Sequence, residues 1–106
     1  MKDLYKDHIA LAKKEITLVT PYFVPKRWFV ALLHQAVLRG VEVSVIIPEN
    51  TEHVLLTKTN YFYMNRAQKL GIKFYLGNSM NHAKIMLIDS DEALIGSQNL
   101  DFCLLN

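Results

Sequence analysis

The sequence predicts a single α/β domain, and three features of the chain support this fold class. The 106 residues are 51% hydrophobic and 21% charged, which is the balance of one globular domain and leaves no room for two. Segments with helical periodicity alternate with short apolar or β-branched runs. No linker, repeat or low-complexity tract interrupts the alternation. We therefore expect residues 1–106 to form one mixed β-sheet flanked by helices.

The first half of the chain has the pattern of helix, strand, helix and strand. Residues 3–14 predict a helix, and the β-branched run at 16–20 predicts a strand. Residues 25–39 predict a helix that Gly40 can end, and residues 41–47 predict a second strand. Such a strand–helix–strand unit normally closes right-handed with its strands parallel. The expected buried stripes of the two helices are Leu4, Tyr5, His8, Leu11 and Ala12, and then Phe29, Leu32, Leu33, Ala36 and Val37.

The second half continues the alternation. Residues 52–70 predict a helix loosened around residues 58–60, and residues 72–76 predict a short strand. Residues 82–89 and 93–97 then predict a β-hairpin. The expected apolar positions of the helix are Leu55, Leu56, Phe62, Tyr63, Ala67 and Leu70.

Four polar side chains of this hairpin are predicted to share one surface. Period-two alternation puts His82 and Lys84 on the same face of their strand. For a turn centred between residues 90 and 91, the numbers of paired residues sum to 181. Lys84 then faces Ser97, and His82 faces Asn99, all within a cross-strand reach of about 5 Å. A slip of one residue in the pairing would put Ser97 and Asn99 on the face opposite His82 and Lys84.

Together these groups suit a tetrahedral oxyanion, for which phosphate is the natural candidate. Lys84 supplies positive charge, Ser97 and Asn99 supply hydrogen-bond donors, and His82 supplies a nucleophile or a proton. Gly96 leaves room for a ligand because it has no side chain. The alternative interpretation of the same residues is a polar sheet face that only contacts solvent.

Asp89 occupies a different place in the predicted hairpin. It lies seven residues after His82, which is more than about 20 Å along an extended strand, and on the opposite face. It therefore cannot orient His82 within one straight strand. The geometry predicts a structural role at the strand end, where Asp89 would hold the turn or a neighbouring basic group.

The spacing of these residues resembles the signature of the phospholipase D superfamily, H-x-K-x(4)-D-x(6)-G-S-x-N. The run from Thr20 to Pro25 and the run from Arg39 to Val43 are similar to the cardiolipin synthase branch, in particular its second catalytic half. The resemblance covers most of the chain and implies a phospholipase D-like sandwich. The matching residues are His82, Lys84, Asp89, Gly96, Ser97 and Asn99.

The resemblance implies metal-independent transfer or hydrolysis of a phosphodiester through a phosphohistidine intermediate, with no cofactor. It assigns His82 as nucleophile or general acid, and Lys84 and Asn99 as phosphate-binding residues. Ser97 supports the phosphate, and Asp89 completes the catalytic motif as an orienting or structural residue. It does not decide between the two roles of His82.

The family's complete site contains two copies of this motif, and the chain has one. The resemblance therefore implies either a homodimer or a second half in a longer parent chain, of which this would be a truncated half-domain, incomplete at its C-terminal end. Cys103 stands where relatives often carry Arg-Ser. The implied substrate is an anionic phospholipid such as phosphatidylglycerol, used in cardiolipin synthesis. The alternatives are a homodimeric phosphodiesterase or nuclease of the same superfamily, and a non-catalytic vestigial half.

Composition restricts the partners further. Twelve Lys and Arg against ten Asp and Glu is a mild balance that argues against nucleic acid as the partner. The single cysteine excludes an internal disulfide, and no Cys/His spacing indicates a metal site. No apolar stretch is long enough to span a bilayer and no signal peptide is indicated, so we expect this chain itself to be soluble. The resemblance to cardiolipin synthases implies that the parent protein associates with the bacterial cell membrane.

Overall fold

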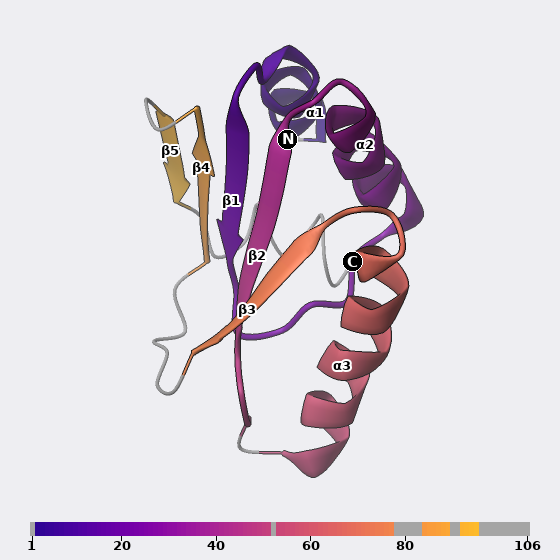
Figure 1. Cartoon of the computed structure of the whole chain (residues 1–106). Helices are drawn as coiled ribbons and strands as arrows, with labels where there is room; N and C mark the ends of the chain where they lie inside the picture. The colour runs from indigo at the N-terminus through magenta and orange to yellow at the C-terminus, as the bar shows by residue number, and fades with distance from the viewer. Residues whose placement is uncertain (1, 52, 78–83, 90–91, 96–106) are drawn as a thin grey trace.

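The elements of the computed structural model follow the order that the sequence predicts (Figure 1). The structure describes residues 2–51, 53–77, 84–89 and 92–95. In chain order the elements are α1 (Lys2–Leu11), β1 (Glu15–Val19), α2 (Arg27–Leu38), β2 (Glu42–Pro48), α3 (Val54–Gln68), β3 (Lys73–Gly77), β4 (Ile85–Ile88) and β5 (Glu92–Ile95). The expected α/β class is confirmed.

The described strands form one mixed sheet in the order β3-β2-β1-β4-β5. Strands β1, β2 and β3 are parallel and are joined by α2 and α3, which confirms the predicted strand–helix–strand unit. Strand β4 then returns to the other side of β1 and runs antiparallel to it. Strands β2 and β3 thus follow on one side of β1, whereas β4 and β5 follow on the other side. The strand order therefore reverses at the junction of β1 and β4.

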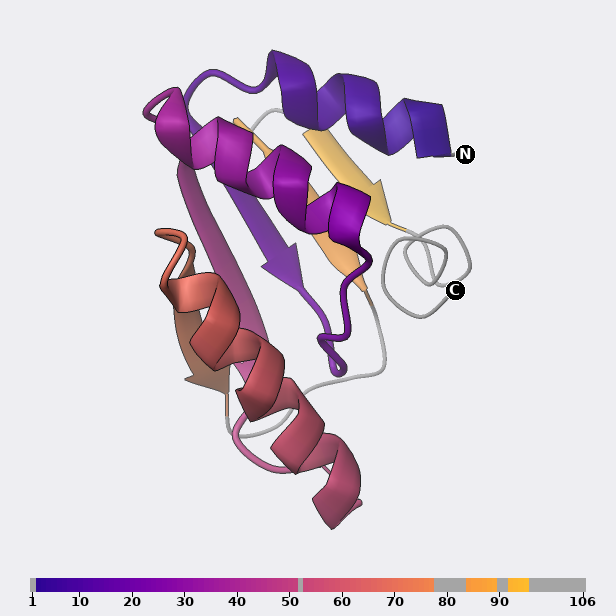
Figure 2. The same cartoon turned by 90° about the vertical axis from the view of Figure 1, so that its right-hand side faces the viewer.

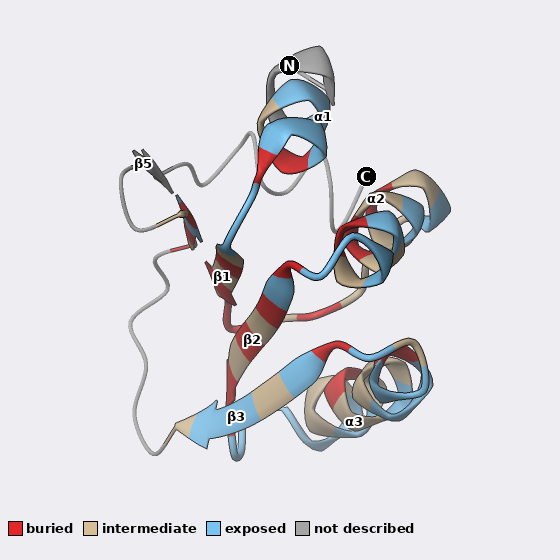
Figure 3. Ribbon diagram, turned by 45° about the horizontal axis from the view of Figure 1, so that its top comes forward, coloured by how far each residue is buried: buried red, intermediate tan, exposed pale blue. Residues whose placement is uncertain are grey.

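The three helices lie on the same face of the sheet (Figures 1 and 2). Alternate residues of the central strands point towards them and form the core, as the burial pattern in Figure 3 shows. Leu18, Val45 and Met86 are fully buried there. Among the described residues, the buried cluster contains Ile9, Ala12, Ile16, Leu18, Phe23, Phe29, Leu33, Ala36, Val41, Val43, Val45, Ile47, Ala67, Ile72, Met86 and Ile88.

The stripe predicted for α2 is confirmed, because Phe29, Leu33 and Ala36 are fully buried. The stripe predicted for α1 is wrong at Leu11, which is 73% exposed, whereas Ile9 is buried. Helix α1 ends at Leu11, earlier than predicted. The Arg39 guanidinium binds the carbonyl oxygens of Ile9 and Ala12 at 2.9 and 3.2 Å, which ties the end of α1 to α2.

Helix α3 runs without a break from Val54 to Gln68, so the predicted loosening at residues 58–60 is wrong. The polar residues there have local uses that keep the helix intact. The hydroxyl of Thr59 donates to the Leu55 carbonyl at 2.8 Å, and Asn60 binds a neighbouring loop. Leu55 and Phe62 are exposed at 75% and 53%, so the predicted apolar stripe of this helix is only partly buried.

Candidate functional site

The best candidate for a site lies at the edge of the sheet where β1 and β2 end. In open α/β sheets, ligands bind outside the carboxyl ends of the strands, at the point where the strand order reverses. Here that point is the junction of β1 with β4. Because β4 is antiparallel to β1, the start of β4 meets the end of β1.

Lys84 occupies this junction. It directly precedes β4, and one step beyond the Val19–Ile85 pair the register sets it beside Thr20. Lys84 is 8% exposed. Alternate residues of a strand lie on the same face, so Lys84 shares the face of the buried Met86, which points towards the helices. Burial lowers the pKa of the Lys84 ammonium group, because removal from water disfavours the charged form. A buried ammonium group of this kind gains most from an anion placed next to it.

The loop that follows β1 is fixed next to Lys84 by side-chain hydrogen bonds. Thr20 is fully buried, and its Oγ1 donates to the Tyr22 carbonyl at 2.9 Å and accepts from the Tyr22 N–H at 3.3 Å. The Phe23 N–H donates to Asn60 Oδ1 at 2.7 Å. Asn60 Nδ2 donates in turn to the Pro21 carbonyl at 3.0 Å.

Asn60 was missed by sequence reasoning, although a polar residue in the middle of an expected apolar helix was a usable signal. Among the described residues, Thr20, Asn60 and Lys84 are the buried polar or charged side chains, and all three belong to this edge. Buried polar groups are costly unless they are hydrogen-bonded. Their concentration here indicates a preorganised loop beside a buried cation.

Asp89 lies at the opposite end of β4, about 16 Å from Lys84 along an extended strand. Its carboxylate accepts hydrogen bonds from the backbone N–H groups of Lys13, Lys14 and Glu15 at 2.7–3.2 Å. These bonds hold the pKa of Asp89 below its usual value. The backbone N–H of Asp89 also donates to the Glu15 carbonyl at 2.8 Å. Asp89 thus joins the β4–β5 turn to the α1–β1 loop.

The predicted register of the hairpin is wrong by one residue. Ile85 pairs with Ile95 and Ile88 pairs with Glu92, so paired numbers sum to 180 instead of 181. Asp89 leaves the ladder after Ile88 with a positive φ of 54°, and its carboxylate binds the α1–β1 loop. The surface predicted for residues 82, 84, 97 and 99 involves residues outside the described part of the chain, so it stays a prediction.

The other predicted site residues lie outside the described part of the chain. They are His82, Gly96, Ser97 and Asn99. Of the predicted set, the structure thus describes only Lys84 and Asp89, and it sets them at opposite ends of one strand.

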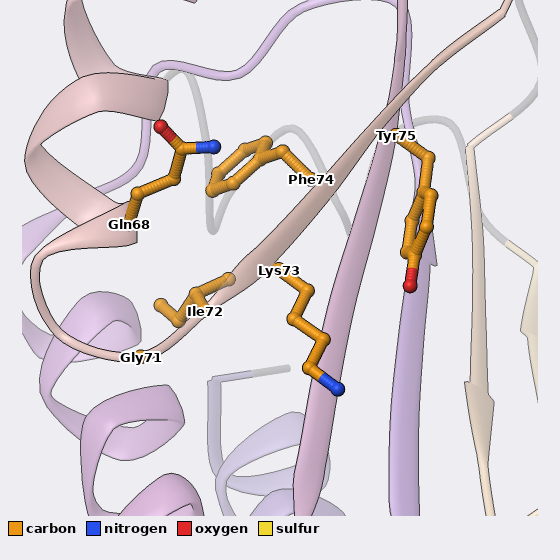
Figure 4. Close-up of a pocket in the computed structure, with 6 residues that line it drawn as sticks. All are labelled: Gln68, Gly71, Ile72, Lys73, Phe74 and Tyr75. Carbon is orange, nitrogen blue, oxygen red and sulfur yellow. The ribbon is translucent and has the colours of Figure 1, made fainter.

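An open hollow elsewhere on the molecule does not coincide with this edge. It wraps around the edge strand β3 near its amino end (Figure 4). It is lined by Gln68, Gly71, Ile72, Lys73, Phe74 and Tyr75. Strands β1 and β2 separate it from β4, so we assign it no part in the candidate site.

The described residues contain no group of three His, Cys, Asp or Glu side chains arranged to hold a metal ion. Within the same part of the chain, every helix is too short or too polar to cross a bilayer.

Comparison with known families identifies the class of protein. Residues 5–103 match the family described as cardiolipin synthase, PLD-like domain. A probable cardiolipin synthase, YwiE, of Bacillus subtilis is 37% identical over 102 residues, which are 95% of this chain and 20% of the relative. Cardiolipin synthase A of Pseudomonas aeruginosa is 36% identical over 92% of this chain and 20% of its own length. The chain thus spans about a fifth of the length of these relatives.

A solved structure agrees with the fold. Nuc, a phospholipase D family member from Salmonella typhimurium, superimposes with a TM-score of 0.65 at 23% sequence identity, over 83% of this chain and 57% of that one. The chain belongs to the cardiolipin synthase, PLD-like domain family, as the family match over nearly its whole length shows.

Proposed function

We propose that this chain supplies one of the two catalytic motifs of a phospholipase D-type enzyme that transfers a phosphatidyl group in cardiolipin synthesis. The observation that carries the proposal is the buried Lys84 at the junction of β1 and β4, next to a hydrogen-bonded loop. The family match and the relatives named as cardiolipin synthases supply the reaction class.

In the proposed reaction, Lys84, Ser97 and Asn99 hold the phosphate oxygens of an anionic phospholipid such as phosphatidylglycerol. One histidine attacks phosphorus and displaces the leaving alcohol, which a second histidine protonates. His82 is one of these two residues, and the other comes from a second motif in the parent chain or in a homodimer. An acceptor alcohol then attacks the phosphohistidine, gives up its proton to the second histidine and releases the product.

Lys84 contributes by stabilising the charge that develops on the phosphate. Its position away from water strengthens that interaction relative to an exposed lysine. In the proposal Ser97 and Asn99, which lie outside the described residues, contact the same phosphate. Asp89 acts at a distance, by fixing the far end of β4 to the α1–β1 loop.

The test uses the full polypeptide that carries this segment, with phosphatidylglycerol vesicles as substrate and cardiolipin formation as the readout. We expect turnover to be unchanged by EDTA and to be lost in His82→Ala. His34→Ala, on helix α2, is the matched control and should keep the parent's turnover. Loss of turnover with EDTA, or full turnover in His82→Ala, would contradict the proposal.

A second substrate separates the two alternatives. A homodimeric phosphodiesterase would hydrolyse a soluble phosphodiester, offered in place of the vesicles, without any lipid acceptor. A vestigial half would leave the parent's turnover untouched when His82 is replaced.

A further inference from the structure

The outward face of α3 combines exposed apolar side chains with cations. Val54 and Leu55 are 71% and 75% exposed, and Phe62 is 53% exposed. Lys58 and Arg66 are also exposed. The Arg66 guanidinium lies over the Phe62 ring at 5.4 Å, so charge and apolar surface are adjacent.

Except for Val54, these side chains form one stripe along the helix, which continues to Lys69 at its C-cap. At 100° per residue, Leu55, Lys58, Phe62, Arg66 and Lys69 fall within about 80° of one another. The buried residues of the helix, Asn60 and Ala67, lie on the other side. The stripe is about 20 Å long, because successive residues rise 1.5 Å along the axis. We call these five residues the α3 stripe.

The charge of this segment has one sign. From His53 to Lys73 the sequence contains no Asp or Glu, although the whole chain carries ten. Exposed cations interspersed with exposed apolar side chains match an anionic lipid surface, where cations meet phosphates and apolar side chains enter the layer below.

The position of the helix fits such a contact. Helix α3 begins after the carboxyl end of β2, at the edge of the sheet that also holds Thr20 and Lys84 (Figures 1 and 2). A membrane touched by the start of α3 would thus lie on the same side of the domain as the candidate site. Nucleic acid, the other polyanion, offers no apolar layer for Leu55 and Val54.

We propose that the α3 stripe is a docking surface for an anionic phospholipid bilayer, so that the domain rests on the membrane from which it draws its substrate. This proposal rests on the proposed function only in its statement that the bound lipid is also the substrate. Binding itself needs no turnover.

The test is sedimentation of the 106-residue chain with vesicles of phosphatidylglycerol, compared with vesicles of phosphatidylcholine. We expect binding to the anionic vesicles that weakens as salt is added. Replacing Lys58 and Arg66 together by Glu should weaken binding ~30-fold or more, since each basic residue near such a surface contributes a factor of roughly five. Lys6→Glu with Lys13→Glu, on exposed sites away from α3, is the charge-matched control and should bind almost as well as the parent.

A second pair of variants tests the apolar part. Leu55→Gln with Phe62→Gln should weaken binding ~10-fold or more, because two exposed apolar groups no longer enter the lipid. Leu38→Gln, on α2 and also 73% exposed, is the matched control. Circular dichroism of each variant verifies that α3 is folded.

The outcomes separate this inference from the proposed function. Vesicle binding is measured without any turnover, so a failure of the catalytic assay leaves the docking result intact. Equal binding to both vesicle types, unchanged binding in both α3 variants, or preferential binding of DNA over vesicles would overturn the docking surface.

Discussion

The two ends of strand β4 carry residues of the same sequence motif but differ in what surrounds them. Lys84, at the start of the strand, is buried beside Thr20 at the carboxyl edge of the sheet, and its pKa is lowered by that burial. Asp89, after the end of the strand, binds three backbone N–H groups of the α1–β1 loop, which lower its pKa. The start of β4 thus belongs to the candidate site, whereas the residue after its end has a structural role.

This difference shows that residues of one motif need not meet in one site. A carboxylate that accepts hydrogen bonds from several backbone N–H groups is stabilised as an anion and has little capacity left for proton transfer. Lys84, by contrast, is buried at the edge where β1 ends, and removal from water strengthens the interaction of its ammonium group with an anion placed next to it. The predictions below test this contrast, beginning with the largest expected effect.

Lys84→Met should have the largest effect on turnover. We expect turnover of the full polypeptide to fall about 100- to 1000-fold, the usual loss when a preorganised electrostatic donor is removed. Stability should change by less than about 1 kcal/mol, since an apolar side chain of similar length replaces a buried charge. Steady-state kinetics and urea unfolding measure the two effects. Lys73→Met, at an exposed lysine paired with Glu42, is the control, and an equal loss of turnover there would break the contrast.

Asn60→Ala should have the largest effect on stability at the carboxyl edge. It leaves the buried Phe23 N–H and Pro21 carbonyl without their partner, at a cost of about 2–3 kcal/mol in the free energy of unfolding. Urea denaturation measures this cost. Asn65→Ala, at an exposed position of the same helix, should cost less than about 0.5 kcal/mol.

Asp89→Asn tests the architectural end through pH. Asparagine keeps an acceptor oxygen and tolerates the positive φ of this position, but it removes the charge. Because the folded pKa lies below the ordinary value of 3.8, the charge stabilises the fold fully at pH values well above 3.8, and this stabilisation is lost as the pH falls through the folded pKa.

The parent should therefore be more stable than Asp89→Asn at pH 7, with a difference that shrinks below pH 4. Urea unfolding across this range measures it, with Asp7→Asn on α1 as the control. A difference that does not depend on pH would show that the carboxylate's charge has no part in the contact. Turnover should fall far less than in Lys84→Met.

Thr20→Val should have the smallest effect. It keeps the shape of a buried residue and removes its two hydrogen bonds with Tyr22, which should cost about 1 kcal/mol. The comparison with Thr17→Val, at a half-buried position of β1 just before this loop, isolates the part due to the loop. A larger cost at Thr17 than at Thr20 would count against a fixed loop.

Most of the fold follows from the sequence because its elements have clear periodicity. The α2 pattern of Phe29, Leu33 and Ala36 predicts the buried face, and Gly40 does adopt a positive φ after this helix, at 94°. The exposure of Leu11 could not be predicted in this way. It depends on how α1 meets α2, which is a tertiary contact.

The site is less predictable than the fold. The motif indicates Lys84, but the hairpin register depends on whether Asp89 pairs with its partner strand or binds the α1–β1 loop. That loop is about 75 residues away in sequence, so no local turn rule includes it. The role of Asn60 could not be predicted for a related reason, because its hydrogen-bond partners Pro21 and Phe23 lie about 40 residues earlier in the sequence.

The most direct test of the account is NMR titration of the Lys84 side chain in the 106-residue chain, with and without inorganic phosphate. We predict that Lys84 titrates below the ordinary lysine value of 10.5, and that phosphate moves its pKa upwards because the anion stabilises the ammonium form. Lys73, which is exposed, should show no such response to phosphate. A Lys84 side chain that titrates at the ordinary value and ignores phosphate would contradict the account.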